Sequence, residues 1–308
     1  MPRRLHLLLL AWLLAAGCAG AQKGGTPPPG DGWFTSEGAR LRYHVRGRGP
    51  PCIVQPGGPG LFWGYLRLPE LEESLTLVYL EPVGSGDSDR LPDPRGYTLD
   101  RWADDVGRLA DHLGLDRFYL LGHSQGGFVA QRFALARSGR LRGLVLVATA
   151  ARTGDAFEAA IATGLVRFAT RPWFAGAVRA MVEEGQAATD AELEDALRRQ
   201  MPLWVADYGR DRARIDPRVA ELQASLGPQA SLRVPFDHRE RLREVRAPTL
   251  VVMPAEDFFP PQLGEEILRA VPGSERVVLD GAGHMAHWDR PRELADAVAA
   301  FARRVEAR

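Results

Sequence analysis

Short runs of apolar and β-branched residues recur along the chain and are separated by polar segments. Runs of this kind are typical of strands that are buried on both faces of a parallel sheet. They span residues 41–45, 52–54, 75–80, 118–121, 144–147, 249–253 and 276–279. We expect these segments to form one central sheet.

Helical patterns alternate with these runs. Between residues 99 and 113, Trp102, Val106 and Leu109 recur at helical spacing, and charged residues occupy the opposite face. This pattern predicts a helix that covers a sheet. The alternation of strands and helices therefore predicts an α/β fold with a mostly parallel sheet and right-handed crossovers.

Residues 152–240 interrupt the alternation, because their pattern is helical and contains no strand. Strand patterns resume at Thr249. We predict a helical cap inserted between two parts of a core, residues 33–151 and residues 241–308. A separate helical domain is the alternative, but the segment both leaves and re-enters the sheet, which favours the cap.

The first residues have the pattern of a secretory signal. Arg3 and Arg4 precede an apolar stretch over residues 5–14, and the small residues 15–17 stand directly before Cys18. The motif LAAGC resembles the lipobox of bacterial lipoproteins, and this resemblance implies that Cys18 is acylated after residues 1–17 are removed. An ordinary cleaved signal with an incidental cysteine is the alternative.

Residues 18–32 are rich in Gly and Pro and contain almost no large apolar side chain, which predicts a tether. Together with a lipid on Cys18, this tether predicts a protein anchored to a membrane of the bacterial cell envelope, outside the cytoplasm. The sequence does not predict the oligomeric state.

Composition excludes several classes of protein. The 308 residues include 39 Lys and Arg and 39 Asp and Glu, so the formal net charge is zero, and nucleic acid is not expected as a partner. The two cysteines, Cys18 and Cys52, are too few for a disulfide framework or a Cys-rich zinc site. We expect neither a metal nor a cofactor.

The clearest chemical motif surrounds Ser124. A predicted strand over 118–121 leads into Gly122-His123-Ser124-Gln125-Gly126 and then into a helical pattern. This is G-x-S-x-G between a strand and a helix, the context in which the serine is a nucleophile. Side chains at the two glycine positions would collide with neighbouring backbone on the sharp turn that the motif requires.

A serine hydroxyl needs a base, and the base needs an orienting carboxylate. Asp257 and His284 each follow a predicted strand, so they are expected at the same edge of the sheet as Ser124. The chain order Ser, Asp, His is that of α/β-hydrolases. Glu256 is the alternative acid and His287 the alternative base.

The oxyanion that forms on attack needs backbone N–H donors. Gln125, which follows the serine, is expected to supply one of them. The second is expected from Gly58, in the loop Gln55-Pro56-Gly57-Gly58-Pro59-Gly60 that follows the strand 52–54.

Several motifs together resemble the α/β-hydrolase superfamily: PGGPG at 56–60, EPVGSGDSDR at 81–90, GHSQGG at 122–127 and GAGHMAHWDRP at 281–291. The GGPG loop is similar to that of the proline-iminopeptidase branch. The resemblance implies cofactor-free cleavage of N-terminal peptide bonds, amides or esters, with cap glutamates holding a substrate amine. GHSQGG itself is closer to esterase-like relatives, and Glu183 and Glu184 are the cap acids in a position to bind an amine.

The sequence therefore predicts a serine hydrolase that acts on a small ester, an amide or a short peptide. A tethered ligand-binding module without turnover is one alternative, and a serine-dependent C–C hydrolase or haloperoxidase is another. A dehalogenase requires an aspartate nucleophile, which Ser124 does not supply.

Overall fold

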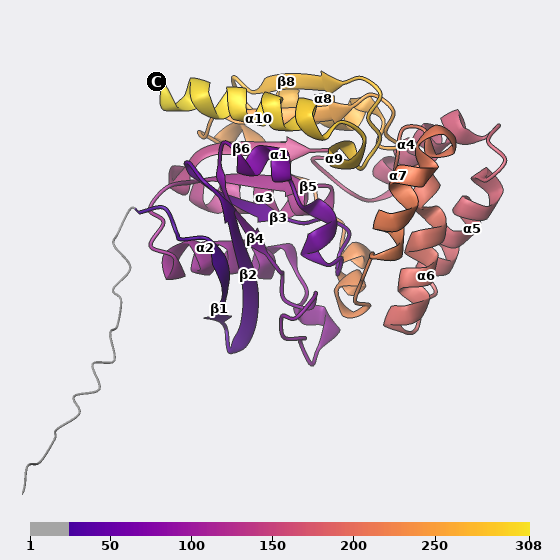
Figure 1. The fold of residues 1–308 in the computed structure, drawn as a ribbon, viewed down its shortest axis with the longest axis horizontal. Coiled ribbons are helices and arrows are strands. Elements are labelled where there is room, and N and C mark those ends of the chain that lie inside the picture. Colours follow the sequence, from indigo (N-terminus) through magenta and orange to yellow (C-terminus); the bar gives the residue numbers. More distant parts are fainter. Residues whose placement is uncertain (1–24) are drawn as a thin grey trace, which may run out of the picture.

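The computed structural model describes residues 25–308, which form an α/β fold around an eight-stranded sheet (Figure 1). The strand order is β1-β2-β4-β3-β5-β6-β7-β8. Strand β2 runs antiparallel to both of its neighbours, β1 and β4, and the other six strands, β3 to β8, run parallel to one another. The strands are β1 (Gly30–Ser36), β2 (Ala39–Gly47), β3 (Pro51–Gln55), β4 (Thr76–Leu80), β5 (Phe118–His123), β6 (Leu141–Val147), β7 (Thr249–Pro254) and β8 (Glu275–Leu279).

Each apolar run identified in the sequence corresponds to one of these strands, although Leu75 lies just before β4. The structure differs from the expectation in three further respects. The run 41–45 belongs to the antiparallel strand β2, and the run 276–279 forms the half-exposed edge strand β8. Strand β1 was not predicted, because most of its residues are exposed and it is held by backbone pairing with β2. The predicted tether boundary at residue 32 is therefore wrong, since residues 30–32 already belong to the sheet.

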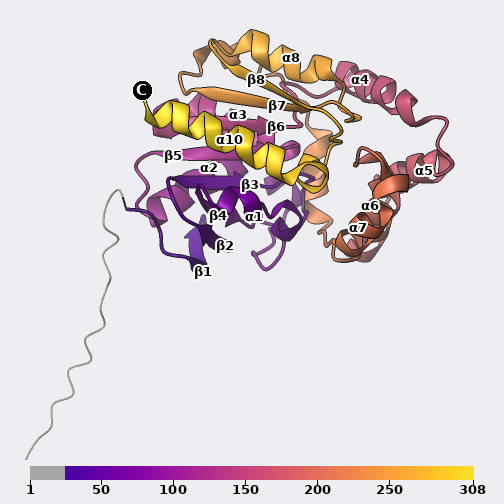
Figure 2. The same cartoon turned by 45° about the horizontal axis from the view of Figure 1, so that its top comes forward.

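Helices cover both faces of the sheet (Figure 2). One face packs against α2 (Leu99–His112), α3 (Gln125–Arg137) and α8 (Pro261–Ala270). The other face packs against α1 (Pro69–Glu72) and α10 (Pro291–Glu306), with α9 (Ala286–Asp289) just before α10. Cys52, in β3, is fully buried, and burial raises the pKa of its thiol to about 12, as expected of a core thiol.

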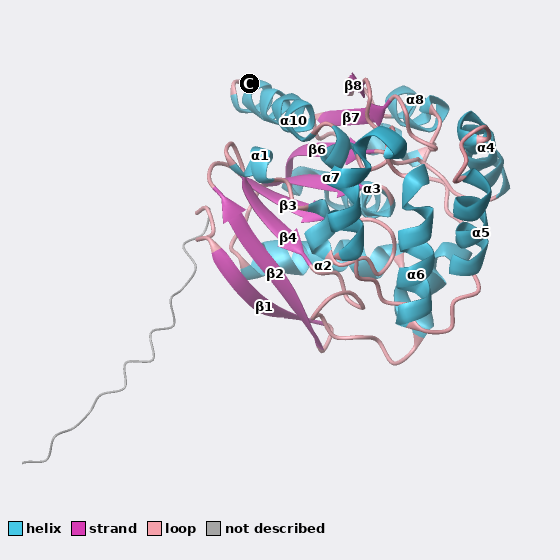
Figure 3. Ribbon diagram, turned by 45° about the vertical axis from the view of Figure 1, so that its right-hand side comes forward, coloured by secondary structure: helices cyan, strands magenta, loops and turns pink. Residues whose placement is uncertain are grey.

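The helices α4 (Asp155–Leu165), α5 (Phe174–Glu184), α6 (Asp190–Gln200) and α7 (Tyr208–Ala220) lie between β6 and β7 in the chain and form a layer beside the sheet (Figure 3). The two chain ends of this insertion meet at one place. Arg152 and Asp237 form an isolated antiparallel bridge, and the His238 N–H donates to the Ala151 carbonyl over 2.9 Å. We call the insertion the cap.

The predicted signal over 1–17 and the predicted lipidation site Cys18 lie outside the described residues. Over residues 25–308, the helices are all too short or too polar to cross a membrane.

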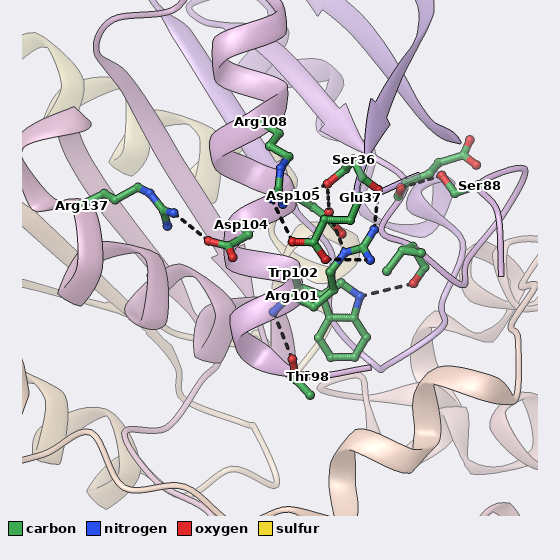
Figure 4. Close-up of polar contacts among 12 residues, drawn as sticks. Ser36, Glu37, Ser88, Thr98, Arg101, Trp102, Asp104, Asp105, Arg108 and Arg137 are labelled. Carbon is green, nitrogen blue, oxygen red and sulfur yellow. Dashed lines mark hydrogen bonds and ion pairs between the residues drawn. The ribbon is translucent and has the colours of Figure 1, made fainter. Parts of the chain in front are cut away.

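A buried cluster of polar side chains links α2 to the end of β1 by hydrogen bonds (Figure 4). The carboxylate of Asp105 accepts hydrogen bonds from the Ser36 hydroxyl and, over 3.0 Å, from Arg101 Nε, and it is fully buried. Burial raises the pKa of Asp105 to about 6, against the hydrogen bonds from Ser36 and Arg101, which lower it. The neighbouring Asp104 pairs with Arg137 and keeps 37% of its side chain exposed.

The raised pKa of Asp105 makes a testable contribution to stability. The folded state binds the proton more tightly than the unfolded chain does, so the stabilisation by this group is present at low pH and is lost as the pH rises through 6. Relative to Asp105→Asn, we expect the wild-type free energy of unfolding to fall by about 2 kcal/mol between pH 4.5 and pH 7.5. Urea unfolding at the two pH values measures this difference.

Asp104→Asn is the matched control, because it removes a carboxylate of the same helix whose ion pair is partly exposed. The difference in the free energy of unfolding between Asp104→Asn and wild type should change by less than about 1 kcal/mol over the same pH interval. An equal pH dependence for both variants would contradict the assignment to Asp105.

Candidate active site

Ser124 occupies a sharp turn between β5 and α3. Its φ is +54°, in the left-handed region that non-glycine residues rarely adopt. A Cβ at position 122 would lie 2.4 Å from the Gly126 carbonyl oxygen, and one at position 126 would lie 2.2 Å from the Gln55 carbonyl oxygen. Both glycines are therefore required by close backbone approach, as the sequence predicts.

The three predicted catalytic residues lie together at the carboxyl ends of the strands. Ser124 Oγ is 2.9 Å from His284 Nε2, and His284 Nδ1 is 3.0 Å from each carboxylate oxygen of Asp257. Asp257 Oδ1 also accepts the Phe259 N–H over 2.9 Å, which fixes the orientation of the carboxylate. Asp257 and His284 are buried, at 3% and 1% exposure.

The two alternative residues lie elsewhere. Glu256 turns outward with 38% of its side chain exposed and pairs with Arg167 of the cap. His287 is buried, and its Nε2 bonds to the Tyr65 carbonyl over 2.8 Å. Burial lowers the pKa of His287 to about 3, so this ring is neutral near pH 7. Asp257, rather than Glu256, contacts the His284 ring, and His284, rather than His287, contacts Ser124.

The two predicted oxyanion donors lie on either side of Ser124. Gln125 is the first residue of α3, so its N–H lies outside the intrahelical ladder and at the positive end of the helix dipole. Gly58 lies in the loop after β3, with a φ of +49°. At Gly57 a Cβ would be only 2.7 Å from the Ser124 Cβ, so this loop passes directly beside the serine. We call residues 55–60 the oxyanion loop.

A cavity of about 520 Å³ opens above Ser124 between the core and the cap. Gly58, Gln125 and His284 also line it. Much of the remaining wall is aromatic, a feature that the sequence analysis did not assign to the site. These aromatic side chains are Phe128, Phe157, Trp204, Phe258 and Phe259.

Among the described side chains, the charged ones that the cap adds to this wall are acidic: Asp155, Glu158 and Glu184. Glu184 accepts hydrogen bonds from Gln200 Nε2 over 2.7 Å and from Gln229 Nε2 over 3.5 Å. Burial raises the pKa of Glu184, against these two hydrogen bonds. Glu183, the other cap acid singled out from the sequence, instead pairs with Arg199.

Other cap acids have structural roles. Thr189 and Glu192 form a capping box at the start of α6, and Glu194 pairs with Arg198 one helical turn later. Within residues 25–308, His, Cys, Asp and Glu side chains do not gather in any group of three that could hold a metal ion.

The sequence profile of the alpha/beta hydrolase fold family matches residues 50–291. This segment is most of the chain, and the protein belongs to that family. The eight-stranded sheet and its flanking helices have the architecture of the alpha/beta hydrolase fold.

Comparisons with individual proteins point to hydrolases. The haloalkane dehalogenase 2 of Mycobacterium tuberculosis is 36% identical over 117 residues, which are 37% of this chain and only 40% of that protein. A proline iminopeptidase of Elizabethkingia meningoseptica is 25% identical over 270 residues, 82% of this chain and 90% of that protein. A solved hydrolase from Pseudomonas aeruginosa has 28% identity and a TM-score of 0.69, covering 88% of this chain and 97% of that one.

Proposed function

We propose that the protein is a cofactor-independent serine hydrolase that cleaves a small carboxylic ester, an amide or an N-terminal peptide bond. The observation that carries the proposal is the hydrogen-bonded series from Ser124 through His284 to Asp257, of which Ser124 and His284 line the cavity. Relatives with iminopeptidase and hydrolase names support the same class of reaction.

In the proposed reaction, His284 Nε2 takes the proton of Ser124 as Oγ bonds to the substrate carbonyl carbon. The N–H groups of Gly58 and Gln125 donate to the oxyanion. The protonated His284 then gives its proton to the leaving group, which departs and leaves an acyl-enzyme. Water attacks the acyl carbon, and His284 accepts a proton from that water. The bond between the acyl carbon and Ser124 Oγ then breaks, His284 returns the proton to Oγ, and the acid is released.

Hydrolysis of p-nitrophenyl butyrate and of aminoacyl p-nitroanilides tests this function and separates ester from amide substrates. Wild type should hydrolyse one class with an initial burst if deacylation is slow, and Ser124→Ala should lose about 10⁴-fold or more in kcat. Full activity in Ser124→Ala would contradict the proposal. Tight binding of these compounds without turnover would instead favour the tethered binding module.

We also propose that the substrate carries a positive charge near the scissile group. Among the residues whose side chains the structure describes, the cap contributes three acids to the cavity wall, and neither Arg nor Lys lines it. The partly desolvated carboxylate of Glu184 would gain most from a cationic partner, because an unpaired buried charge is unfavourable. The proline-iminopeptidase resemblance agrees with an amine at this position.

Glu184→Gln is expected to raise KM about 10-fold for alanine p-nitroanilide, because charge-assisted hydrogen bonds contribute about 1.5–3 kcal/mol. KM for isobutyryl p-nitroanilide, in which a methyl group replaces the ammonium group, should change less than about 2-fold by the same argument. Glu183→Gln is the control, since Glu183 pairs with Arg199. Equal effects of Glu184→Gln on both substrates would contradict the charge argument.

For the N-terminus, we propose that Cys18 carries the lipid that anchors the protein to a membrane of the cell envelope. Support comes from the LAAGC motif and the tether that follows it. Cys18→Ser should move the protein from the membrane fraction to the soluble fraction and abolish labelling by a palmitate analogue. Unchanged fractionation and labelling would contradict lipidation.

A further inference from the structure

A buried chain of hydrogen bonds lies behind Ser124, on the side away from the cavity. The Gly57 N–H donates to the Tyr65 hydroxyl over 2.7 Å, and this hydroxyl lies 2.9 Å from His123 Nδ1. The other ring nitrogen, His123 Nε2, lies 2.9 Å from the His284 carbonyl oxygen. His123 is 1% exposed and Tyr65 is 8% exposed.

Only one arrangement of protons satisfies every member of this chain. The Tyr65 oxygen accepts from Gly57, so its own hydrogen is free to donate to His123 Nδ1. Nδ1 is then an acceptor, and the proton of the neutral ring is on Nε2, where it donates to the His284 carbonyl. Burial lowers the pKa of His123 well below its usual range, which keeps the ring neutral.

The chain connects three of the four segments that hold the proposed catalytic groups; the loop of Asp257 is the fourth. Gly57 precedes Gly58 in the oxyanion loop, and His123 precedes Ser124 at the turn. The His284 carbonyl belongs to the residue whose ring contacts Ser124. Tyr65 is itself held in place, because its carbonyl accepts from Trp288 Nε1 over 2.9 Å.

We infer that Tyr65 and His123 are positioning residues, which hold the oxyanion loop and the His284 loop at a fixed distance from Ser124. This inference rests on the proposed serine hydrolase function. Neither side chain lines the cavity, so both act through the residues they bond. Small displacements of reacting groups are costly, since about 1 Å of misplacement can lower a rate about 100-fold.

Tyr65→Phe tests the inference, and Tyr79→Phe is its matched control. The Tyr79 hydroxyl also accepts a backbone N–H, that of Leu68 over 2.9 Å, and also donates one bond, to Glu72. Tyr79 is 1% exposed and lies in the same apolar cluster, and the two hydrogen bonds of its hydroxyl go to Leu68 and Glu72, outside the proposed catalytic segments. Both variants therefore lose one buried hydroxyl that accepts a backbone N–H and donates to a side chain.

We expect Tyr65→Phe to lower kcat for the best ester or amide about 10- to 100-fold, with KM changed less than about 3-fold. Binding of a boronic acid, which forms a tetrahedral adduct with the serine, should weaken by a similar factor. Tyr79→Phe should keep kcat within about 2-fold of wild type, since surface and core positions away from a site affect stability rather than chemistry. Equal kcat values for the two variants would overturn the inference.

Variants of His123 provide a second, independent measurement. Gln at position 123 offers one acceptor and one donor, whereas Leu offers neither. We expect His123→Gln to retain about 10-fold more kcat than His123→Leu. Equal losses in the two variants would contradict a hydrogen-bonded positioning role.

Failure of this inference can be distinguished from failure of the proposed function. A wild-type protein that neither turns over substrate nor reacts at Ser124 would overturn the proposed function itself. An active wild type together with an unaffected Tyr65→Phe variant overturns only this inference.

Discussion

Asp257→Asn is expected to lower kcat about 10⁴-fold without unfolding the protein. Both carboxylate oxygens lie 3.0 Å from His284 Nδ1, so the aspartate accepts a hydrogen bond from Nδ1–H and leaves Nε2 free to take the proton of Ser124. An asparagine amide can present its NH₂ group to Nδ1 and thereby select the opposite tautomer. Steady-state kinetics on the best substrate, with circular dichroism to check folding, measures the effect.

Glu256→Gln is the control, because Glu256 is the adjacent acid in the same loop and points outward to Arg167. We expect its kcat to stay within about 3-fold of wild type, because an exposed ion pair contributes little. A large loss in Glu256→Gln together with full activity in Asp257→Asn would reverse the assignment of the acid.

Gly126→Ala is the second variant with a large expected effect. Its new Cβ would lie 2.2 Å from the Gln55 oxygen and 2.5 Å from the Pro56 oxygen, both backbone atoms at the start of the oxyanion loop. The backbone of α3 or of the oxyanion loop must therefore shift, and this shift moves the two segments apart. We expect a loss of about 3 kcal/mol in the free energy of unfolding and a fall of at least about 100-fold in kcat, as for loss of one oxyanion donor.

Gly139→Ala is the control for the added methyl group, since a Cβ there meets no other atom within 4 Å. Its free energy of unfolding should stay within about 1 kcal/mol of wild type and its kcat should be unchanged. Chemical denaturation and steady-state kinetics are to be measured on both variants. A Gly126→Ala protein as stable and as active as Gly139→Ala would show that the close approach at this position is not required.

The sequence was informative about the core because local patterns encode it. Buried strands require apolar residues, and the turn at Ser124 requires glycine at positions 122 and 126, so both features can be recognised without long-range contacts. Strand β1 was missed because most of its side chains are exposed and carry no such pattern. Its pairing with β2 combines backbone hydrogen bonds with ion pairs from Asp31 to Arg42 and Arg46, which no local pattern reveals.

Other features of the site depend on contacts between distant segments. The choice between Glu256 and Asp257 depends on how one loop turns, and Arg167 of the cap bonds to that loop. Trp204 reaches the cavity wall only because the cap folds over the core, and its carbonyl accepts the Met285 N–H beside His284. Tyr65 and His123 are likewise far apart in sequence, so no spacing rule could have paired them.

Labelling with a fluorophosphonate probe, followed by mass spectrometry of the intact protein and its peptides, tests the central proposal most directly. The proposal predicts one adduct per chain, on the peptide that contains Ser124. The adduct should be absent in Ser124→Ala and form much more slowly in His284→Ala. A folded wild-type protein that forms no adduct, or one that is labelled equally in Ser124→Ala, would contradict a serine hydrolase built on Ser124, His284 and Asp257.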